Sequence, residues 1–222
     1  MFKQLSKCLN SRGLWPAIAL VIAINLWLFV KAGGDGLLYN AVAPRGIVSL
    51  ELAGNPARGK EIIHSWRRTP SGVSWSAPAK PGTQPPSLVE VALSSLRYDN
   101  VYMFSYTITL ALTCLIAATV IETRHPKLKR FGLARAGTLL ARVQVLVLVL
   151  DATENFAVWR MLRGSDSYVW AALARSAALP KFALIGITAI YILFVFIVRI
   201  SGPAPRRSHV SPRPNAVSVR AA

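Results

Sequence analysis

Three polar side chains stand together in a stretch of sequence that is otherwise hydrophobic enough to cross a bilayer. Residues 138–162 carry Asp151, Glu154 and Asn155 near their middle. A charged group at the centre of a membrane span costs about 2.5–3.5 kcal/mol even on insertion scales, so such groups usually face protein or water and often mark a site. A carboxyl pair in this setting could bind a cation, carry a proton or, in principle, perform acid–base chemistry.

The elements that must position these groups are hydrophobic runs. The chain has 222 residues, 53% of them hydrophobic, and its aliphatic residues fall in long blocks. Long blocks are typical of membrane proteins rather than of a soluble core. We therefore expect an all-α membrane protein, a four-transmembrane-helix bundle with spans at residues 14–31, 100–121, 138–162 and 179–200.

The first span has a second interpretation. Residues 1–13 are basic, residues 14–31 are apolar, and Val30-Lys31-Ala32 ends in a small residue, which together also describe a cleavable signal peptide. The apolar run is longer than the roughly 7–15 residues of a usual signal core. We favour a retained membrane anchor, and the sequence leaves both readings open.

A small insertion is expected between the first two spans, over residues 32–99. Alternating apolar and polar residues from Ile47 to Leu52 predict a short strand. Asn55-Pro56 is a good helix start, and it predicts a helix to about Trp66. Residues 69–87 contain five prolines and no periodicity, which indicates a flexible loop.

The second span is predicted to belong to a longer helix. Ser87 and Glu90 have the spacing of a capping box, so a helix should begin there and continue into residues 100–121. Asp99, Tyr102 and Tyr106 then fall on one helical face. This face places a carboxyl and two phenols at the head of the second span.

Basic residues set the expected orientation. Residues 1–13, 122–137 and 199–222 hold 3, 5 and 5 Lys and Arg against a single acid. By the positive-inside rule these segments are cytoplasmic. Both termini should therefore lie in the cytoplasm, residues 201–222 as a disordered tail, with the insertion and the short 163–178 loop outside the plasma membrane.

In that orientation, polar groups from three spans meet in the outer half of the bilayer. Lys181 opens the fourth span, and Asp151 lies about 16 Å from the outer end of the third, at about 1.5 Å per residue. If the spans face each other, one polar cluster forms, a candidate ligand site as well as a polar core. Its members are Asp99, Tyr102, Tyr106, Asp151, Glu154, Asn155 and Lys181.

The cluster is short of positive charge. Three carboxyls face one lysine, which leaves two negative charges uncompensated if all are ionised. Burial of unpaired carboxylates is unfavourable. Either one carboxyl is protonated, or Arg97 or Arg163 reaches into the cluster, or a cation binds.

Sequence motifs for catalysis or cofactor binding are not found. His64, His125 and His209 lie outside the expected spans, without metal-ligand spacing. No nucleophile elbow or phosphate-binding glycine loop occurs. Cys8 and Cys114 should lie at different depths, which disfavours a disulfide. We therefore assign no catalytic residue, metal or cofactor, and we lean against an enzyme.

The net charge of +17 points to anionic partners. The basic residues flank apolar blocks, so the headgroups of membrane lipids at the cytoplasmic face are the expected partner. The aromatic-interleaved basic motifs of RNA-binding proteins are absent, which argues against nucleic acid. A protein partner or a homo-oligomer remains open.

An ordered set of short motifs resembles a group of uncharacterised bacterial four-span membrane proteins. The set covers about residues 47–198. It comprises Glu51-Leu52-Ala53 with a helix ending at Trp66, Arg97-Tyr98-Asp99-Asn100, the L-D-x-x-E-N motif at residues 150–155, and Pro180-Lys181-Phe182. The resemblance implies a four-span bundle with polar positions in the spans, and it implies no activity.

Two main classes of function stay open on the sequence. In the first, the polar cluster binds a cation, a proton or a lipid headgroup. In the second, the protein is a structural or assembly subunit, and the cluster only fixes helix packing, as interhelical hydrogen bonds worth about 0.6–2 kcal/mol can do. An intramembrane enzyme is a third. A cavity that reaches Asp151 would favour the first class, and a fully paired core with an exposed apolar patch over residues 47–66 would favour the second.

Overall fold

The described part of the chain is helical and contains no strand. A computed structural model describes residues 14–32, 36–68, 87–124, 128, 131–165 and 167–201. Its elements are α2 (Leu14–Ala32), α3 (Ile47–Glu51), α4 (Pro56–Arg68), α5 (Leu88–Arg124), α7 (Leu133–Leu162) and α8 (Tyr168–Ser201). The expected basic N-terminus with Cys8, most of the proline-rich loop and the C-terminal tail lie outside these residues.

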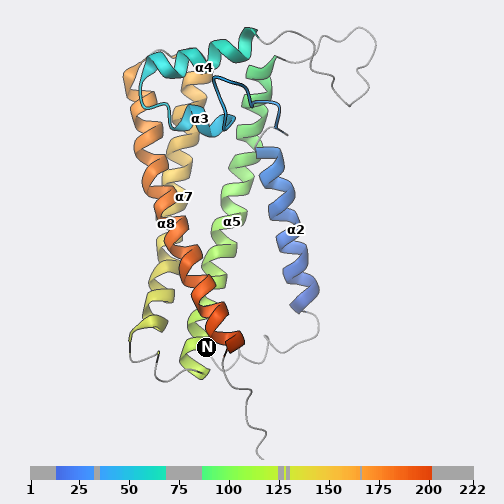
Figure 1. Ribbon diagram of the computed structural model, residues 1–222, viewed down its shortest axis with the longest axis vertical. Coiled ribbons are helices and arrows are strands. Elements are labelled where there is room, and N and C mark those ends of the chain that lie inside the picture. Colours follow the sequence, from blue (N-terminus) through green and yellow to red (C-terminus); the bar gives the residue numbers. More distant parts are fainter. Residues whose placement is uncertain are drawn as a thin grey trace, which may run out of the picture.

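The three longest helices form the body of the molecule. Helices α5, α7 and α8 pack along one another, and α2 packs on α5 (Figure 1). The short helices α3 and α4 lie across one end of the bundle, which we call the capped end (Figure 1). By length and composition, α5, α7 and α8 are apolar enough to cross a membrane.

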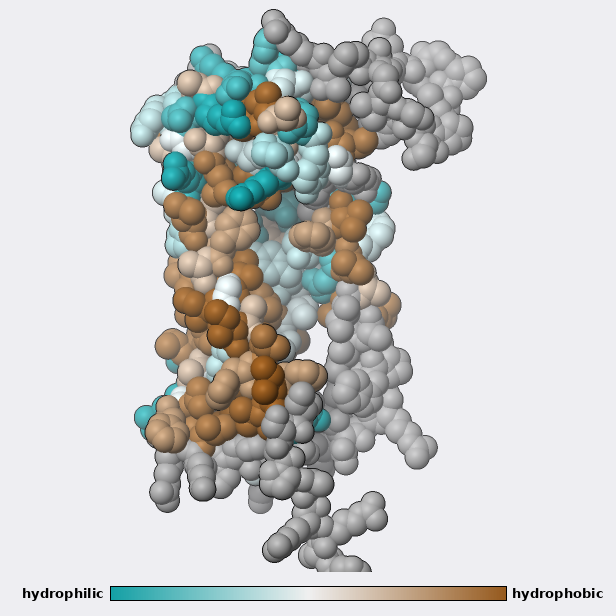
Figure 2. Space-filling model, in the orientation of Figure 1, coloured by the Kyte–Doolittle hydropathy of each residue, from teal (hydrophilic) through white to brown (hydrophobic). Residues whose placement is uncertain are grey.

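The surface of the bundle supports a helical membrane protein. Large apolar side chains are exposed along its sides, whereas hydrophilic residues gather over the capped end (Figure 2). Soluble monomers rarely expose contiguous apolar patches of more than a few hundred Å². The exposed residues include Val101, Phe104, Ile108 and Leu112 of α5, Leu139, Leu146, Val149 and Phe156 of α7, and Ile187, Ile190, Leu193 and Ile197 of α8.

The predicted strand at residues 47–52 is wrong, because this segment is the helix α3. A helix buries Ile47, Leu50 and Glu51 together on one face against the bundle. The alternation that predicted a strand would have separated Ile47 and Glu51 from Leu50 on opposite faces. Gly46 precedes the helix with φ 57°, a conformation that favours glycine, and lets the chain turn into it.

The insertion packs onto the bundle through an apolar core at the capped end. Trp66 of α4 is 1% exposed, and its indole Nε1 donates a hydrogen bond to the Leu38 carbonyl at 3.0 Å. This core joins α3 and α4 to α5, α7 and α8, and it includes Leu50, Ile62, Leu96, Val158 and Ala174. The position of α3 over the bundle is therefore fixed by burial.

Two helix starts agree with the sequence prediction. Asn55 caps α4 by accepting a hydrogen bond from the Arg58 amide at 2.9 Å. Ser87 and Glu90 form the capping box of α5, with the Ser87 amide donating to Glu90 Oε2 at 2.7 Å. Helix α5 then continues without interruption through Asp99.

Helix α8 differs from the expectation. It begins at Tyr168, eleven residues before the predicted span, so most of the expected 163–178 loop is helical. Alanines in this segment pack at helical spacing against the bundle, at positions 171, 174 and 178. The segment therefore stays helical ahead of Pro180, which lies inside the helix rather than in its first turn.

A close crossing of three helices gives a first testable prediction. Gly137 of α7 is buried, and a methyl group added there would meet the Tyr191 hydroxyl of α8 and lie 3.0 Å from the Ala118 Cβ of α5. Overpacking costs about 1–3 kcal/mol. We expect Gly137→Ala to lower the free energy of unfolding in detergent by an amount in this range.

The matched control is Gly186→Ala in α8, where an added methyl group meets nothing within 4 Å. A helical Gly-to-Ala change without a clash is neutral or stabilising by about 0.5–1 kcal/mol. Equal unfolding midpoints for the two variants would contradict the close crossing at Gly137.

Candidate functional site

The centre of the candidate site is one lysine between two carboxylates. Lys181 Nζ of α8 lies 2.9 Å from Asp151 Oδ1 and 2.6 Å from Glu154 Oε2, both on α7. All three side chains are almost fully buried, with side-chain exposures of 8%, 2% and 0%. The ion pairs bridge α7 and α8 at about three turns from the capped ends of both helices.

Helix α5 adds a phenol and a third carboxylate. The Tyr106 hydroxyl donates a hydrogen bond to Asp151 Oδ2 at 2.5 Å, so both oxygens of Asp151 have partners. Asn155 of α7 donates to Asp99 Oδ2 at 2.6 Å. Asp99 is thus held by a neutral amide, and its charge is not matched by an ion pair in the described residues.

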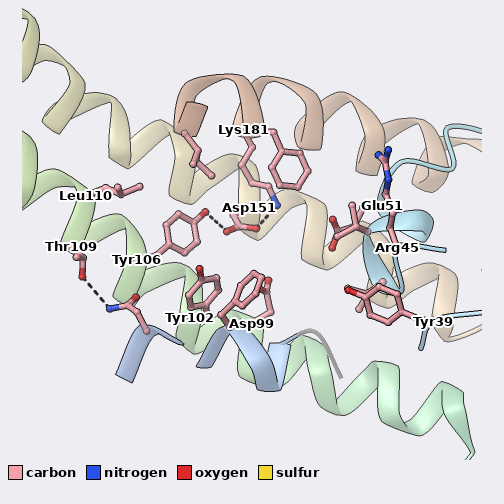
Figure 3. Close-up of a pocket in the computed structure, with 16 residues that line it drawn as sticks. Tyr39, Arg45, Glu51, Asp99, Tyr102, Tyr106, Thr109, Leu110, Asp151 and Lys181 are labelled. Carbon is pink, nitrogen blue, oxygen red and sulfur yellow. Dashed lines mark hydrogen bonds and ion pairs between the residues drawn. The ribbon is translucent and has the colours of Figure 1, made fainter. Parts of the chain in front are cut away.

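Tyr102 lines the same site without reaching the ion pairs. Its ring packs against Tyr106 with centroids 5.0 Å apart, and against Phe29 of α2 at 5.9 Å. The structure therefore brings together all seven residues of the predicted cluster. The face of α5 that begins at Asp99 points to α7 and α8, as its spacing predicted (Figure 3).

Glu51 of α3 also belongs to the cluster, although it is not among the seven residues predicted to form it. Its side chain is 7% exposed, and its carboxyl lies against that of Glu154. Burial raises the pKa of Glu51 well above its usual range, and the negative charge of Glu154 raises it further. Protonated Glu51 can donate a hydrogen bond to Glu154, because a contact between two carboxyls needs one proton.

Glu51 is part of the motif Glu51-Leu52-Ala53, but the alternation of apolar and polar residues around it predicts a strand. A strand would have placed Glu51 on the same face as Ile47 and Ser49. The helical interpretation puts it beside Leu50, towards the bundle.

A cavity of about 480 Å³ adjoins these side chains. Figure 3 shows its lining residues coming from α2, α3, α5, α7 and α8 and from the segment before α3. Asp99, Tyr102, Tyr106, Asp151 and Lys181 lie in the middle, with Glu51 towards one end and Thr109 and Leu110 at the other. The size lies within the 300–1,000 Å³ range of small-molecule pockets. The remaining lining residues are mainly apolar, among them Phe29, Val48, Leu110, Phe182 and Ile185.

The two arginines considered as counter-charges lie elsewhere. Arg97 and Arg163 line a separate cavity of about 310 Å³ between α5 and α7, and Arg163 sits over the Trp159 ring at 5.7 Å. The four carboxyls of the cluster therefore face Lys181, with Arg45 exposed at the cavity rim. With Glu51 protonated, three carboxylates still face one buried lysine.

The cluster does not have the form of a metal centre. Within the described ranges, no group of three or more His, Cys, Asp and Glu side chains is arranged to hold a metal ion.

Further from the capped end, Gln144 of α7 donates a hydrogen bond to Thr188 Oγ1 of α8 at 3.0 Å. That hydrogen bond extends the polar seam between α7 and α8 towards the opposite end of the bundle.

No family model, curated protein or solved structure matches the chain.

Proposed function

We propose that the chain is a four-span protein of the cell membrane that binds a positively charged group in the acidic cavity at the capped end. Helix α2 is the remaining span, and the capped end faces outwards. The termini are cytoplasmic. The cavity beside Asp151 is the observation that carries this proposal, because a pocket of this size is available to a ligand.

The sign of the ligand follows from the charges around the cavity. Asp99 and Asp151 both line it, and Lys181 balances only one of the charges that Asp99, Asp151 and Glu154 carry when ionised, while Arg45 is exposed at the rim. An uncompensated negative charge is unfavourable in a poorly solvated site. A cation beside Asp99 would relieve this, since Asp99 has a neutral hydrogen-bond partner.

The topology rests on the same charge argument as the sequence analysis. The basic segments 1–13, 122–137 and 199–222 flank the ends of the long helices that lie away from α3 and α4. Positive residues are enriched on the cytoplasmic side of membrane proteins. The cavity then opens in the outer half of the membrane.

The structural alternative uses the same contacts. The bonds from Lys181 to Asp151 and from Asn155 to Asp99 each join two helices, so they also fix the packing of α5, α7 and α8. If the cluster only fixed helix packing, a closed core without an adjoining cavity would be sufficient. The adjoining cavity favours binding over that alternative.

The test is a binding titration of the full chain in lipid nanodiscs with methylammonium, the smallest primary alkylammonium ion. We expect saturable heat of binding in the wild type and at least a tenfold weaker affinity in Asp99→Asn, equivalent to about 1.4 kcal/mol. Asp99 is the chosen position because its removal leaves Lys181 with both of its carboxylates.

The matched control is Glu61→Gln, which removes an exposed carboxylate on α4 paired with Arg58. Its affinity should equal that of the wild type. A wild-type protein that gives no saturable binding, or an Asp99→Asn variant that binds as tightly, would overturn the proposal.

A further inference from the structure

The polarity of the side chains that line the cavity changes along the bundle axis. Its acidic part, with Asp99, Tyr106 and Asp151, lies nearer the capped end. One turn further along α5 and α8 the lining includes the apolar side chains of Leu110 and Ile185, beside a hydrogen bond from Asn25 of α2 to Thr109 that satisfies both polar groups in part. A ligand that fills the whole cavity must therefore be polar at one end and apolar at the other.

The cavity also adjoins the lipid-facing surface. Its walls come from α2 on one side and α8 on the other, while α2 packs mainly on α5. Phe29 of α2 and Phe182 of α8 line it and are 59% and 41% exposed. Figure 2 shows pale and hydrophilic residues on the side of the bundle, between two brown surfaces.

We propose that the ligand is an amphiphile with a primary amine, which enters from the bilayer between α2 and α8. Its ammonium group lies against Asp99 and Asp151, beside Phe29, and its hydrocarbon chain lies along Leu110 and Ile185. This inference rests on the proposed function, since it names the class of ligand for the same cavity.

The physical reason is complementarity at both ends of the ligand. A small hydrated ion would satisfy the carboxylates but leave the apolar lining wet, whereas each buried CH₂ contributes about 0.8 kcal/mol. An anionic lipid would meet the excess of carboxylates and be repelled. An ammonium group also supplies N–H donors to carboxylate oxygens, which makes strong charge-assisted hydrogen bonds.

The experiment is photo-crosslinking of the full chain in phosphatidylcholine nanodiscs. The probe is a long-chain primary amine with a diazirine near the end of its chain, and the matched probe has a hydroxyl in place of the amine. We expect the amine probe to label α2 and α8 around Asn25 and Ile185 at least tenfold more than the alcohol does. This comparison uses only the wild-type protein, so it does not depend on the folding of a variant.

A substitution at the apolar end separates this inference from the proposed function. Ile185→Trp should fill the chain-binding part and reduce amine-probe labelling at least fivefold, while methylammonium binds as in the wild type. The control is Ile187→Trp, at a position on α8 that does not line the cavity and is 53% exposed. It should leave labelling unchanged.

A further arm identifies the source of the amine. Replacing half of the phosphatidylcholine with phosphatidylethanolamine should suppress labelling if a membrane aminolipid is the ligand, and should leave it unchanged if a free long-chain amine is. Equal labelling by the amine and alcohol probes, with methylammonium still bound, would overturn this inference alone. Equal labelling together with no methylammonium binding would overturn both proposals.

Discussion

Replacing Lys181 with methionine will cause the largest loss of stability of any single substitution in the cluster. Lys181 is the partner of both Asp151 and Glu154, at 2.9 and 2.6 Å, and both carboxylates are buried. Removing one partner of a buried ion pair costs about 3–5 kcal/mol, because it leaves an uncompensated charge. We expect the unfolding midpoint of Lys181→Met in detergent to fall accordingly.

Two further variants identify charge as the cause. The triple variant Lys181→Met, Asp151→Asn and Glu154→Gln has no buried charge at these positions, so it should recover much of the lost stability. Arg142→Met removes an exposed cation from α7 and should change the midpoint little. A Lys181→Met protein as stable as the Arg142→Met protein would contradict the buried ion pairs.

Replacing Glu51 with glutamine will remove a pH dependence from the docking of α3. The carboxyl of Glu51 lies against Glu154, near Lys181 and Asp99, and burial raises its pKa well above the usual range. Opening of α3 exposes this carboxyl to water, where its pKa returns to about 4.3. Docked and open states therefore bind different numbers of protons between these two pKa values.

The sign of the effect follows from the linkage relation. In that window the docked state holds a proton that the open state has released, so docking weakens as pH rises towards the raised pKa. One proton gives a slope of at most about 1.4 kcal/mol per pH unit. Below about pH 4.3 both states are protonated and the docking free energy is constant.

Hydrogen exchange at the end of α3 measures this equilibrium. The Leu52 and Ala53 amides donate to the Val48 and Leu50 carbonyls at 3.1 and 3.2 Å, so their protection reports whether α3 is formed. After correction for intrinsic exchange, protection should fall with rising pH in the wild type and stay flat in Glu51→Gln. The exposed-residue control Glu61→Gln should keep the wild-type slope, and a slope shared by all three proteins would refute the assignment to Glu51.

Much of the cluster could be placed from the sequence because helices have a fixed period. Asp99 and Tyr106 share a face whatever the rest of the fold, and Asp151, Glu154 and Asn155 do so as well. Charged residues within the apolar runs also indicate which face of each helix turns towards the protein interior, because lipid cannot solvate a charged side chain. The capping box at Ser87 likewise allowed the start of α5 to be predicted from a local sequence pattern.

The remaining parts of the site depend on tertiary packing. Helix α3 has only five residues, which is too short for periodicity to separate it from a strand, and its burial against the bundle decides its structure. Pro180 locally favours a helix start, but the buried alanines before it keep that segment helical, so α8 begins earlier, at Tyr168. The cavity depends on α2 packing on α5 away from α8, which no local pattern encodes.

The order of the charged residues along the chain has a consequence for biosynthesis. Glu51, Asp99, Asp151 and Glu154 are all made before Lys181, the cation that pairs with two of them. Helix α7 entering a bilayer alone would carry two unpaired acids, at about 2.5–3.5 kcal/mol for an aspartate at the centre of a span. Helix α7 ends at Leu162 and α8 begins at Tyr168, so the two helices are close enough in the sequence to enter as one hairpin, with their charges already neutralised in part. We expect the translocon to release these two helices as a pair.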